Sequence, residues 1–275
     1  MKRFYIFAIA LLTLAVCGCD PIIDDRQMGG IVPQEKLDIS VTNLTEGSNA
    51  IVLENKTPHT GSYWDTGICI STRRCDTIVM PYVGDVEIKF TGLCDGGQVT
   101  TTHKVHITKI DHPVQKEWTL FAGSSTEGKK WTWNINGTAG AVYGTAGWLT
   151  QFAPEWDVKP LDKLEDRDCS LVFDLNGGAN VSKVDASGRV IEKGTFSFDM
   201  GVTKANPDDG LQWSIGQITL NGVSMLSGHP YYDSGTKVTT FEILKLTDNE
   251  MVLCYNTPDA DAWTDATFWM LCRKQ

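Results

Sequence analysis

The chain has 275 residues, and its 34 acidic side chains exceed its 24 basic ones, which gives a formal net charge of −10. An acidic surface repels phosphate backbones, so nucleic acid is disfavoured as a partner. Hydrophobic residues make up 41% of the chain, a share that excludes a disordered protein. The 26 glycines and 10 prolines are scattered as turn punctuation, which favours many short strands over long helices.

Residues 1–18 have the pattern of a secretory signal peptide. Lys2 and Arg3 precede an apolar run from Phe4 to Val16. This run is too short for a permanent transmembrane helix, which needs about 20 residues, and it lacks the polar face of a buried N-terminal helix. A basic start, an apolar middle and small residues at the end are typical of a segment removed after export.

The signal ends in Val16-Cys17-Gly18-Cys19, which resembles a bacterial lipobox. In that pattern Gly18 precedes the cut and Cys19 receives the lipid, whereas Cys17 is the weaker candidate because the larger Val16 precedes it. The resemblance implies a protein anchored to the outer membrane through acyl chains on Cys19, with the rest of the chain outside the bilayer.

Residues 19–35 are predicted to form an acidic tether, because Asp20, Asp24 and Asp25 follow Cys19 closely. Acidic residues at this place resemble the surface-export signal of Bacteroidota-type lipoproteins. That resemblance implies a protein that faces the cell exterior, and a merely solvated linker is the alternative interpretation.

Residues 36–112 are predicted to form a small β-sandwich of about seven strands. Alternation is clearest in Asp85–Phe90, where apolar residues share one face, and Asp95–Gly97 predicts a hairpin turn before a strand at Val99–Ile110. Further strands are expected at Leu37–Thr42, Ala50–Glu54, Ile68–Ser71 and Thr77–Met80.

The closing pattern VEIKF, GG and KVHI of this region resembles a PKD-type, immunoglobulin-like module. Trp64 stands where that family keeps a buried tryptophan, so the resemblance implies a core role for Trp64 rather than ligand contact.

Residues 113–275 are predicted to form a larger antiparallel β-barrel or β-sandwich of about ten strands. Pro113 interrupts the preceding pattern, and Trp118–Phe121 begins the new domain. The stretch 137–163 is predicted to be rich in loops, and Asp185–Gly188 is a strong hairpin signal. Strands are expected at Lys129–Ile135, Cys169–Leu175, Asn180–Val184, Arg189–Glu192, Thr195–Met200, Leu211–Leu220, Val238–Leu246, Glu250–Tyr255 and Ala266–Arg273.

The segments LVFDLNGG, FSF, ITLNG, FEILKLTDNEMVL and FWMLCRK together resemble the lipocalin-like β domains of secreted Bacteroidota lipoproteins, and a jelly roll is the other fold considered. A PKD-type module before an aromatic-rich β domain is also similar to the lipid-anchored glycan-binding proteins of outer-membrane glycan-uptake systems. This second resemblance implies a glycan ligand and an outer-membrane transporter complex as partner.

Besides Cys17 and Cys19 the chain has six cysteines, and their spacing predicts either buried thiols or one to two disulfide bridges, without fixing the pairing. Cys69 and Cys75 flank a predicted hairpin, and Cys254 and Cys272 lie on the last two predicted strands. Cys169 shares its parity with inward-facing residues. The six are Cys69, Cys75, Cys94, Cys169, Cys254 and Cys272.

Eight of the nine tryptophans follow Pro113. An aromatic ring can stack on the apolar face of a sugar, and loops commonly carry binding groups. Trp148 and Trp156 lie in a stretch without strand alternation, so they are the main candidate ligand-binding residues. Tyr231, Tyr232 and Trp263, in other predicted turns, complete the candidate set, and the remaining tryptophans are expected in the core.

Catalytic motifs are absent from the sequence, which has no Gly-x-Ser-x-Gly elbow, no His-Glu-x-x-His helix and no phosphate loop. Glu155 and Asp157 flank Trp156, but this spacing is ordinary loop composition. No cofactor is expected. Carboxylates in two acidic turns could help hold calcium, although solvated turns explain them more simply. These carboxylates are Asp208, Asp209, Asp259, Asp261 and Asp265.

The sequence therefore favours a lipid-anchored surface protein that captures an extracellular glycan without cleaving it, with the PKD-type module as a spacer. A lipocalin-like pocket for a small apolar ligand and a structural or adhesive surface protein are the alternatives. A glycoside hydrolase with hidden carboxylates is the least favoured one.

Overall fold

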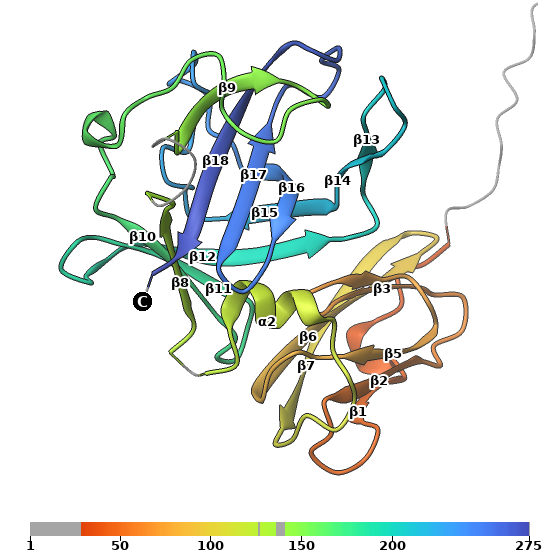
Figure 1. Ribbon diagram of the computed structural model, residues 1–275. Helices are drawn as coiled ribbons and strands as arrows, with labels where there is room; N and C mark the ends of the chain where they lie inside the picture. The colour runs from red at the N-terminus through yellow and green to blue at the C-terminus, as the bar shows by residue number, and fades with distance from the viewer. Residues whose placement is uncertain (1–28, 126, 136–140, 275) are drawn as a thin grey trace, which may run out of the picture.

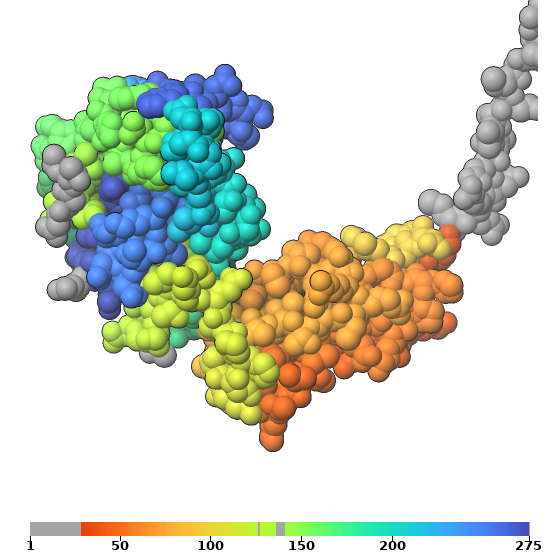
Figure 2. Space-filling view, turned by 45° about the vertical axis from the view of Figure 1, so that its right-hand side comes forward, coloured from red at the N-terminus to blue at the C-terminus, as the bar shows by residue number. Residues whose placement is uncertain are grey.

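The computed structural model describes residues 29–125, 127–135 and 141–274. The predicted signal peptide, the predicted lipidation site Cys19 and the tether up to residue 28 lie outside the described residues. The protein is all-β, as predicted, apart from short helical segments (Figure 1). No helix in the described ranges is both long and apolar enough to cross a bilayer. Figure 2 shows two lobes, the N-terminal one in red to orange and the larger one in green to blue.

The N-terminal lobe contains a three-stranded sheet of order β1-β2-β5 and a four-stranded sheet of order β4-β3-β6-β7. Six of these strands lie at or near their predicted positions, whereas β3 was not among the predicted strands, and the β6–β7 hairpin turns at the expected glycines. Its elements are η1 (Gln34–Lys36), β1 (Ile39–Asn43), β2 (Ala50–Asn55), β3 (Gly61–Asp65), β4 (Ile70–Ser71), β5 (Cys75–Val79), β6 (Gly84–Cys94) and β7 (Gly97–Ile107).

Both N-terminal sheets contribute to one hydrophobic core. Trp64 of β3 is fully buried, as predicted, and its ring lies 4.5 Å from that of Phe90. Its indole Nε1 donates to the carbonyl of Arg73 at 2.9 Å, so the polar edge of the ring is also satisfied. Leu53 of β2 belongs to the same core. The immunoglobulin-like, PKD-type identity of this lobe stays a prediction.

The chain leaves the N-terminal sheets through a segment that Asn49 holds in place. Its side-chain Oδ1 accepts hydrogen bonds from the backbone N–H groups of Asp111 (3.1 Å) and His112 (2.9 Å). The hydroxyl of Ser48 donates to Asp111 at 2.6 Å, and this hydrogen bond is the main reason that the pKa of Asp111 lies well below its usual range.

The segment around Trp118, which was expected to begin an all-β domain, forms a helix, α2 (Lys116–Ala122). Trp118, Phe121 and Ala122 are buried at helical spacing, and the Trp118 ring lies 4.5 Å from that of Phe198. The indole of Trp131 donates to the carbonyl of Phe121 at 2.8 Å, which satisfies one of the last carbonyls of the helix. The helix thereby packs across the end of the larger lobe that faces the N-terminal sheets (Figure 1).

The larger lobe is a closed eight-stranded antiparallel barrel of order β17-β16-β15-β12-β11-β10-β8-β18, in which β18 pairs back with β17. Strand β9 adds to the outer edge of β18, and the β13–β14 hairpin lies outside the barrel. The elements are β8 (Lys129–Trp133), β9 (Tyr143–Gly147), η3 (Leu161–Lys163), β10 (Ser170–Asp174), β11 (Asn180–Val184), β12 (Val190–Asp199), β13 (Lys204–Ala205), β14 (Gln212–Ser214), β15 (Gly216–Asn221), β16 (Thr240–Leu246), β17 (Glu250–Tyr255) and β18 (Asp265–Arg273).

Large side chains fill the interior of the barrel. Trp131 and Trp133 point inward, as predicted, and Trp269 joins them with its Nε1 donating to the carbonyl of Leu226 at 2.7 Å. Ile135 was expected to be the last residue of the same strand, but it is 59% exposed because β8 ends at Trp133. An eight-stranded barrel is just wide enough for side chains to fill it, so this one has a packed core.

Three strand predictions need correction. β9 lies inside the stretch that was predicted to be loop, and the single strand expected at Leu211–Leu220 is split into β14 and β15. The two strands expected at Arg189–Glu192 and Thr195–Met200 are instead one long strand, β12.

The expected cysteine neighbours are not formed, and all six described cysteines are free thiols. Cys69 precedes β4, whereas Cys75 begins β5 in the other sheet, so no hairpin joins them. On β17 and β18, Cys254 pairs with Phe268 and Cys272 with Glu250, which places the two thiols far apart along the ladder. Cys169 is half-buried against the barrel core.

Replacing Trp269 with alanine should lower the free energy of unfolding by about 3–5 kcal/mol, because it leaves a cavity and an unpaired carbonyl in the barrel core. Urea denaturation measures this loss. Trp156→Ala, at a ring that is 45% exposed, should change the same quantity by only about 0.5 kcal/mol. Equal losses for the two variants would contradict the packing described for the barrel.

Candidate functional site

Four of the five predicted ligand-binding aromatics lie beside strand β9, on the outer edge of the barrel. The chain after β9 folds back along it, so the carbonyl of Thr145 accepts the backbone N–H groups of Glu155 (3.0 Å) and Trp156 (2.9 Å). The backbone N–H of Thr145 donates in turn to the carbonyl of Asp157 at 2.7 Å. We call the group of Trp156, Tyr231, Tyr232 and Trp263 the β9 track.

Trp263 is the most firmly held exposed ring of the β9 track. It is 50% exposed, and its indole Nε1 donates to the carboxylate of Asp208 at 2.9 Å. Its backbone N–H donates to the carbonyl of Trp148 at 3.0 Å. A Cβ atom on Gly147 would come within 3.0 Å of the Trp263 ring, so the glycine allows the indole to lie directly against the end of β9.

The backbone of Trp263 is in the left-handed region at φ 65°, as is that of Leu149 at φ 62°. Residues with side chains rarely adopt this conformation, which costs on the order of 1–2 kcal/mol. The two residues lie on facing loops, joined through the Trp263–Trp148 backbone hydrogen bond, so surrounding contacts hold this strained turn.

Tyr231 and Tyr232 continue the β9 track. Their rings meet edge to face with centroids 5.0 Å apart. Tyr232 is 63% exposed and its hydroxyl donates to the carboxylate of Asp157, which raises the pKa of the tyrosine. Tyr231 is half-buried, and its backbone N–H donates to the hydroxyl of Thr267 on β18 at 2.9 Å. Two exposed rings of the track, Tyr232 and Trp263, are therefore each hydrogen-bonded to a carboxylate.

The tyrosines also line a cleft of about 700 Å³ beneath the loop before β10. A buried ion pair supports its wall, with Lys183 Nζ 2.9 Å from the carboxylate of Asp166. Lys159 and His229 add polar groups to the lining. The β9 track thus runs from the Trp263 loop to a polar cleft.

Trp148 does not belong to the track, because its ring is buried rather than open to solvent, and its role as a ligand-binding residue stays a prediction. The side chain is only 4% exposed and packs edge to face on Trp213, with ring centroids 4.9 Å apart. The left-handed turn at Leu149 redirects the chain after β9, and Trp148 is thereby tucked between the barrel wall and the β13–β14 hairpin.

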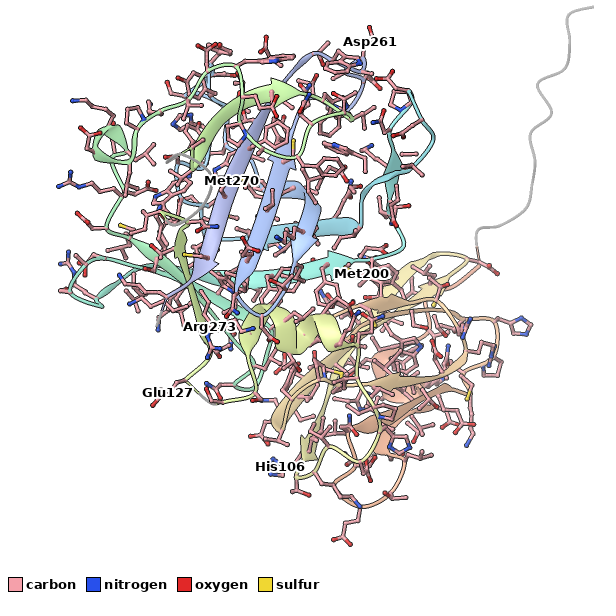
Figure 3. The ribbon with its side chains drawn as sticks, in the orientation of Figure 1. His106, Glu127, Met200, Asp261, Met270 and Arg273 are labelled. Atoms are coloured by element: carbon pink, nitrogen blue, oxygen red, sulfur yellow. The ribbon has the colours of Figure 1, made fainter. Side chains whose placement is uncertain are left out.

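The loop between β17 and β18 carries Trp263 at the end of the barrel far from the N-terminal sheets. Figure 3 labels Asp261 in this loop and His106 on β7 at the opposite end of the molecule. Within the described ranges, no group of three or more His, Cys, Asp or Glu side chains could hold a metal ion. Asp208, one of the residues considered for calcium, instead accepts the hydrogen bond from Trp263.

Sequence reasoning named Asp157 and Asp208 but missed their hydrogen bonds to the rings of the track. Asp208 lies 55 positions from Trp263, and no local pattern connects them. No protein-family model matches the chain, and no curated protein matches its sequence.

Replacing Asp208 with alanine should release the Trp263 indole, because its Nε1–H then loses its acceptor. We expect the exchange of this indole proton with solvent to become faster, as measured by NMR. Asp259→Ala, which removes an exposed carboxylate from the β17–β18 loop, should leave the exchange unchanged. Unchanged exchange in Asp208→Ala would show that the hydrogen bond does not fix the ring.

Proposed function

We propose that this protein is a lipid-anchored surface protein that binds an extracellular glycan without cleaving it, and that the β9 track is its binding surface. The observation that carries the proposal is Trp263, a half-exposed indole fixed by its backbone, by Asp208 and by Gly147. A ring that is already ordered loses little conformational freedom when a sugar stacks on it.

The polar groups beside the rings suit the same ligand. Asp157 and Asp208 offer carboxylate oxygens next to Tyr232 and Trp263, where they can accept hydrogen bonds from sugar hydroxyls. Each of these carboxylates is already engaged by an aromatic side chain. This supports a positioning role rather than acid–base catalysis, so we propose binding without cleavage.

Because the barrel interior is packed, we favour a ligand that binds on the surface over a small apolar ligand held inside the barrel. A lipocalin-like carrier would need space along the barrel axis, where this chain places Trp131, Trp133 and Trp269. A few stacking contacts imply an affinity in the micromolar to millimolar range.

The remaining parts of the proposal concern location. Acyl chains on Cys19 would hold the protein at the outer membrane, and the N-terminal lobe, as a PKD-type immunoglobulin-like module, would act as a spacer that faces the barrel outward. A glycan captured there would pass to an outer-membrane transporter complex. The β17–β18 loop, which carries Trp263 and the labelled Asp261, lies at the end of the barrel remote from the N-terminal sheets, and this position supports the arrangement (Figure 3).

The ligand class is tested by affinity electrophoresis of the protein through gels that contain soluble β-glucans, xylans, mannans or galactans. At least one polysaccharide should retard the wild type. The double variant Trp156→Ala/Trp263→Ala should lose at least about tenfold in affinity, because each stacked ring contributes on the order of 1 kcal/mol or more.

Tyr63→Ala is the matched control, because it removes an exposed ring from the N-terminal lobe. This variant should be retarded like the wild type. Retardation by none of the polysaccharides, or equal retardation of the wild type and the double variant, would overturn the proposed site.

The anchor is tested by detergent phase partition of the full chain expressed in a bacterium. Cys19→Ala should move the protein from the detergent phase to the aqueous phase, because it removes the acylated residue. Cys17→Ala is the matched control, two positions away, and should remain in the detergent phase. The reverse pattern would contradict the assignment of Cys19.

A further inference from the structure

A second candidate site lies on the outer wall of the barrel, in a cavity of about 190 Å³ beneath the β13–β14 hairpin and the β17–β18 loop. Its lining includes Trp148, Lys204, Gln217, Glu242, Asn256 and Pro258. At about 30 Å³ per water molecule this volume is enough for roughly six waters. The exposed positions of Thr240 and Pro258 place its opening at the surface.

Glu242 is the unusual member of this cavity. It stands on β16 between Phe241 and Ile243, which both face the barrel core, so its own side chain points outward. The neighbouring strands place Gln217 and Cys254 directly opposite it. Only 5% of Glu242 is exposed, so a carboxyl group is buried at the base of the cavity.

The two oxygens of Glu242 differ in their partners. Oε1 accepts a hydrogen bond from Gln217 Nε2 at 2.7 Å and lies 3.7 Å from Lys204 Nζ. Oε2 is buried and has no hydrogen-bond partner among the described residues. A buried carboxylate oxygen without a donor is costly, and a molecule in the cavity, whether water or a ligand, can supply one.

The charges in the cavity indicate which kind of ligand can donate a hydrogen bond to Glu242 Oε2. Lys204 Nζ lies 5.8 Å from the centre of the Trp148 ring and within ion-pair distance of Glu242, so the two charges of the site balance. A neutral ligand with hydroxyl groups can donate to Glu242 Oε2 and accept from Lys204, whereas an ammonium ligand would compete with Lys204 for the same carboxylate. The amide of Asn256 and the ring of Trp148 complete a polar and aromatic lining.

We propose that this cavity binds one neutral, hydroxylated sugar unit, through Glu242 as acceptor and Lys204 as donor. The choice of a sugar among hydroxylated ligands rests on the proposed function. The β17–β18 loop connects the two sites, because Asn256 lines the cavity and donates through Nδ2 to Thr264, next to Trp263 of the β9 track, at 2.9 Å. Trp148, which is unsuited to open stacking, thereby gains a role in an enclosed subsite.

Saturation-transfer NMR and calorimetry with glucose, galactose, mannose, xylose and N-acetylglucosamine test this inference. At least one of these neutral sugars should bind the wild type. Glu242→Gln, which preserves the shape of the side chain, and Lys204→Met should each weaken that binding at least fivefold. Lys245→Met removes a second lysine from the same barrel, one paired with Glu250, and should bind like the wild type.

Glucosamine and glucuronate, as charged probes, should bind more weakly than the neutral sugars, and a preference for either would overturn the neutral class. Thermal melting confirms that each variant is folded. Neutral-sugar binding that survives both Glu242→Gln and Lys204→Met, or is absent from the wild type, would also overturn the inference. The double variant Trp156→Ala/Trp263→Ala should keep this binding. A failure of the β9 track to bind polysaccharide can therefore be distinguished from a failure of the cavity to bind a single sugar.

Discussion

The pairing of β18 with three other strands is the constraint on which both the barrel and the candidate site depend. One edge of β18 pairs with β17, and the other edge pairs first with β9 and then with β8. Because β8 covers only Leu271–Arg273, the preceding part of β18, Asp265–Trp269, is left for β9. β9 therefore continues this side of β18 where β8 ends, and its own free edge is covered by the returning segment that carries Trp156.

The packing of the barrel decides where a ligand can bind. Aromatic side chains fill the axis and α2 packs across one end, so binding groups lie on the outer wall and on the loops at the other end. The strained backbone of Trp263 and Leu149 lies at that other end. Such strain persists where surrounding contacts hold the backbone in place. Here Trp263 is held by its hydrogen bonds to the carbonyl of Trp148 and to the carboxylate of Asp208. The proposed glycan surface and the proposed sugar cavity both border this strained turn.

Alternation in the sequence predicted most strands of the protein, because segments such as Asp85–Phe90 have one buried and one exposed face. It failed where tertiary contacts replace that pattern. Tyr143–Gly147 is buried on both faces, so β9 has no alternation to detect. Trp118 lies in a seven-residue helix that the barrel stabilises more than its own propensity does. Four of the five candidate rings lie together beside β9, but the burial of Trp148 and of Glu242 follows from tertiary neighbours that no local pattern shows.

The most direct test of the account follows the indole N–H signals of the nine tryptophans by NMR during titration with β-glucan, xylan and mannan oligosaccharides. The account predicts that the signals of Trp156 and Trp263 move with a saturable dependence on at least one oligosaccharide, while those of Trp131, Trp133 and Trp269 stay in place. Unmoved Trp156 and Trp263 signals with every oligosaccharide, or shifts confined to the three core indoles, would contradict the central claim that the β9 track is a carbohydrate-binding surface.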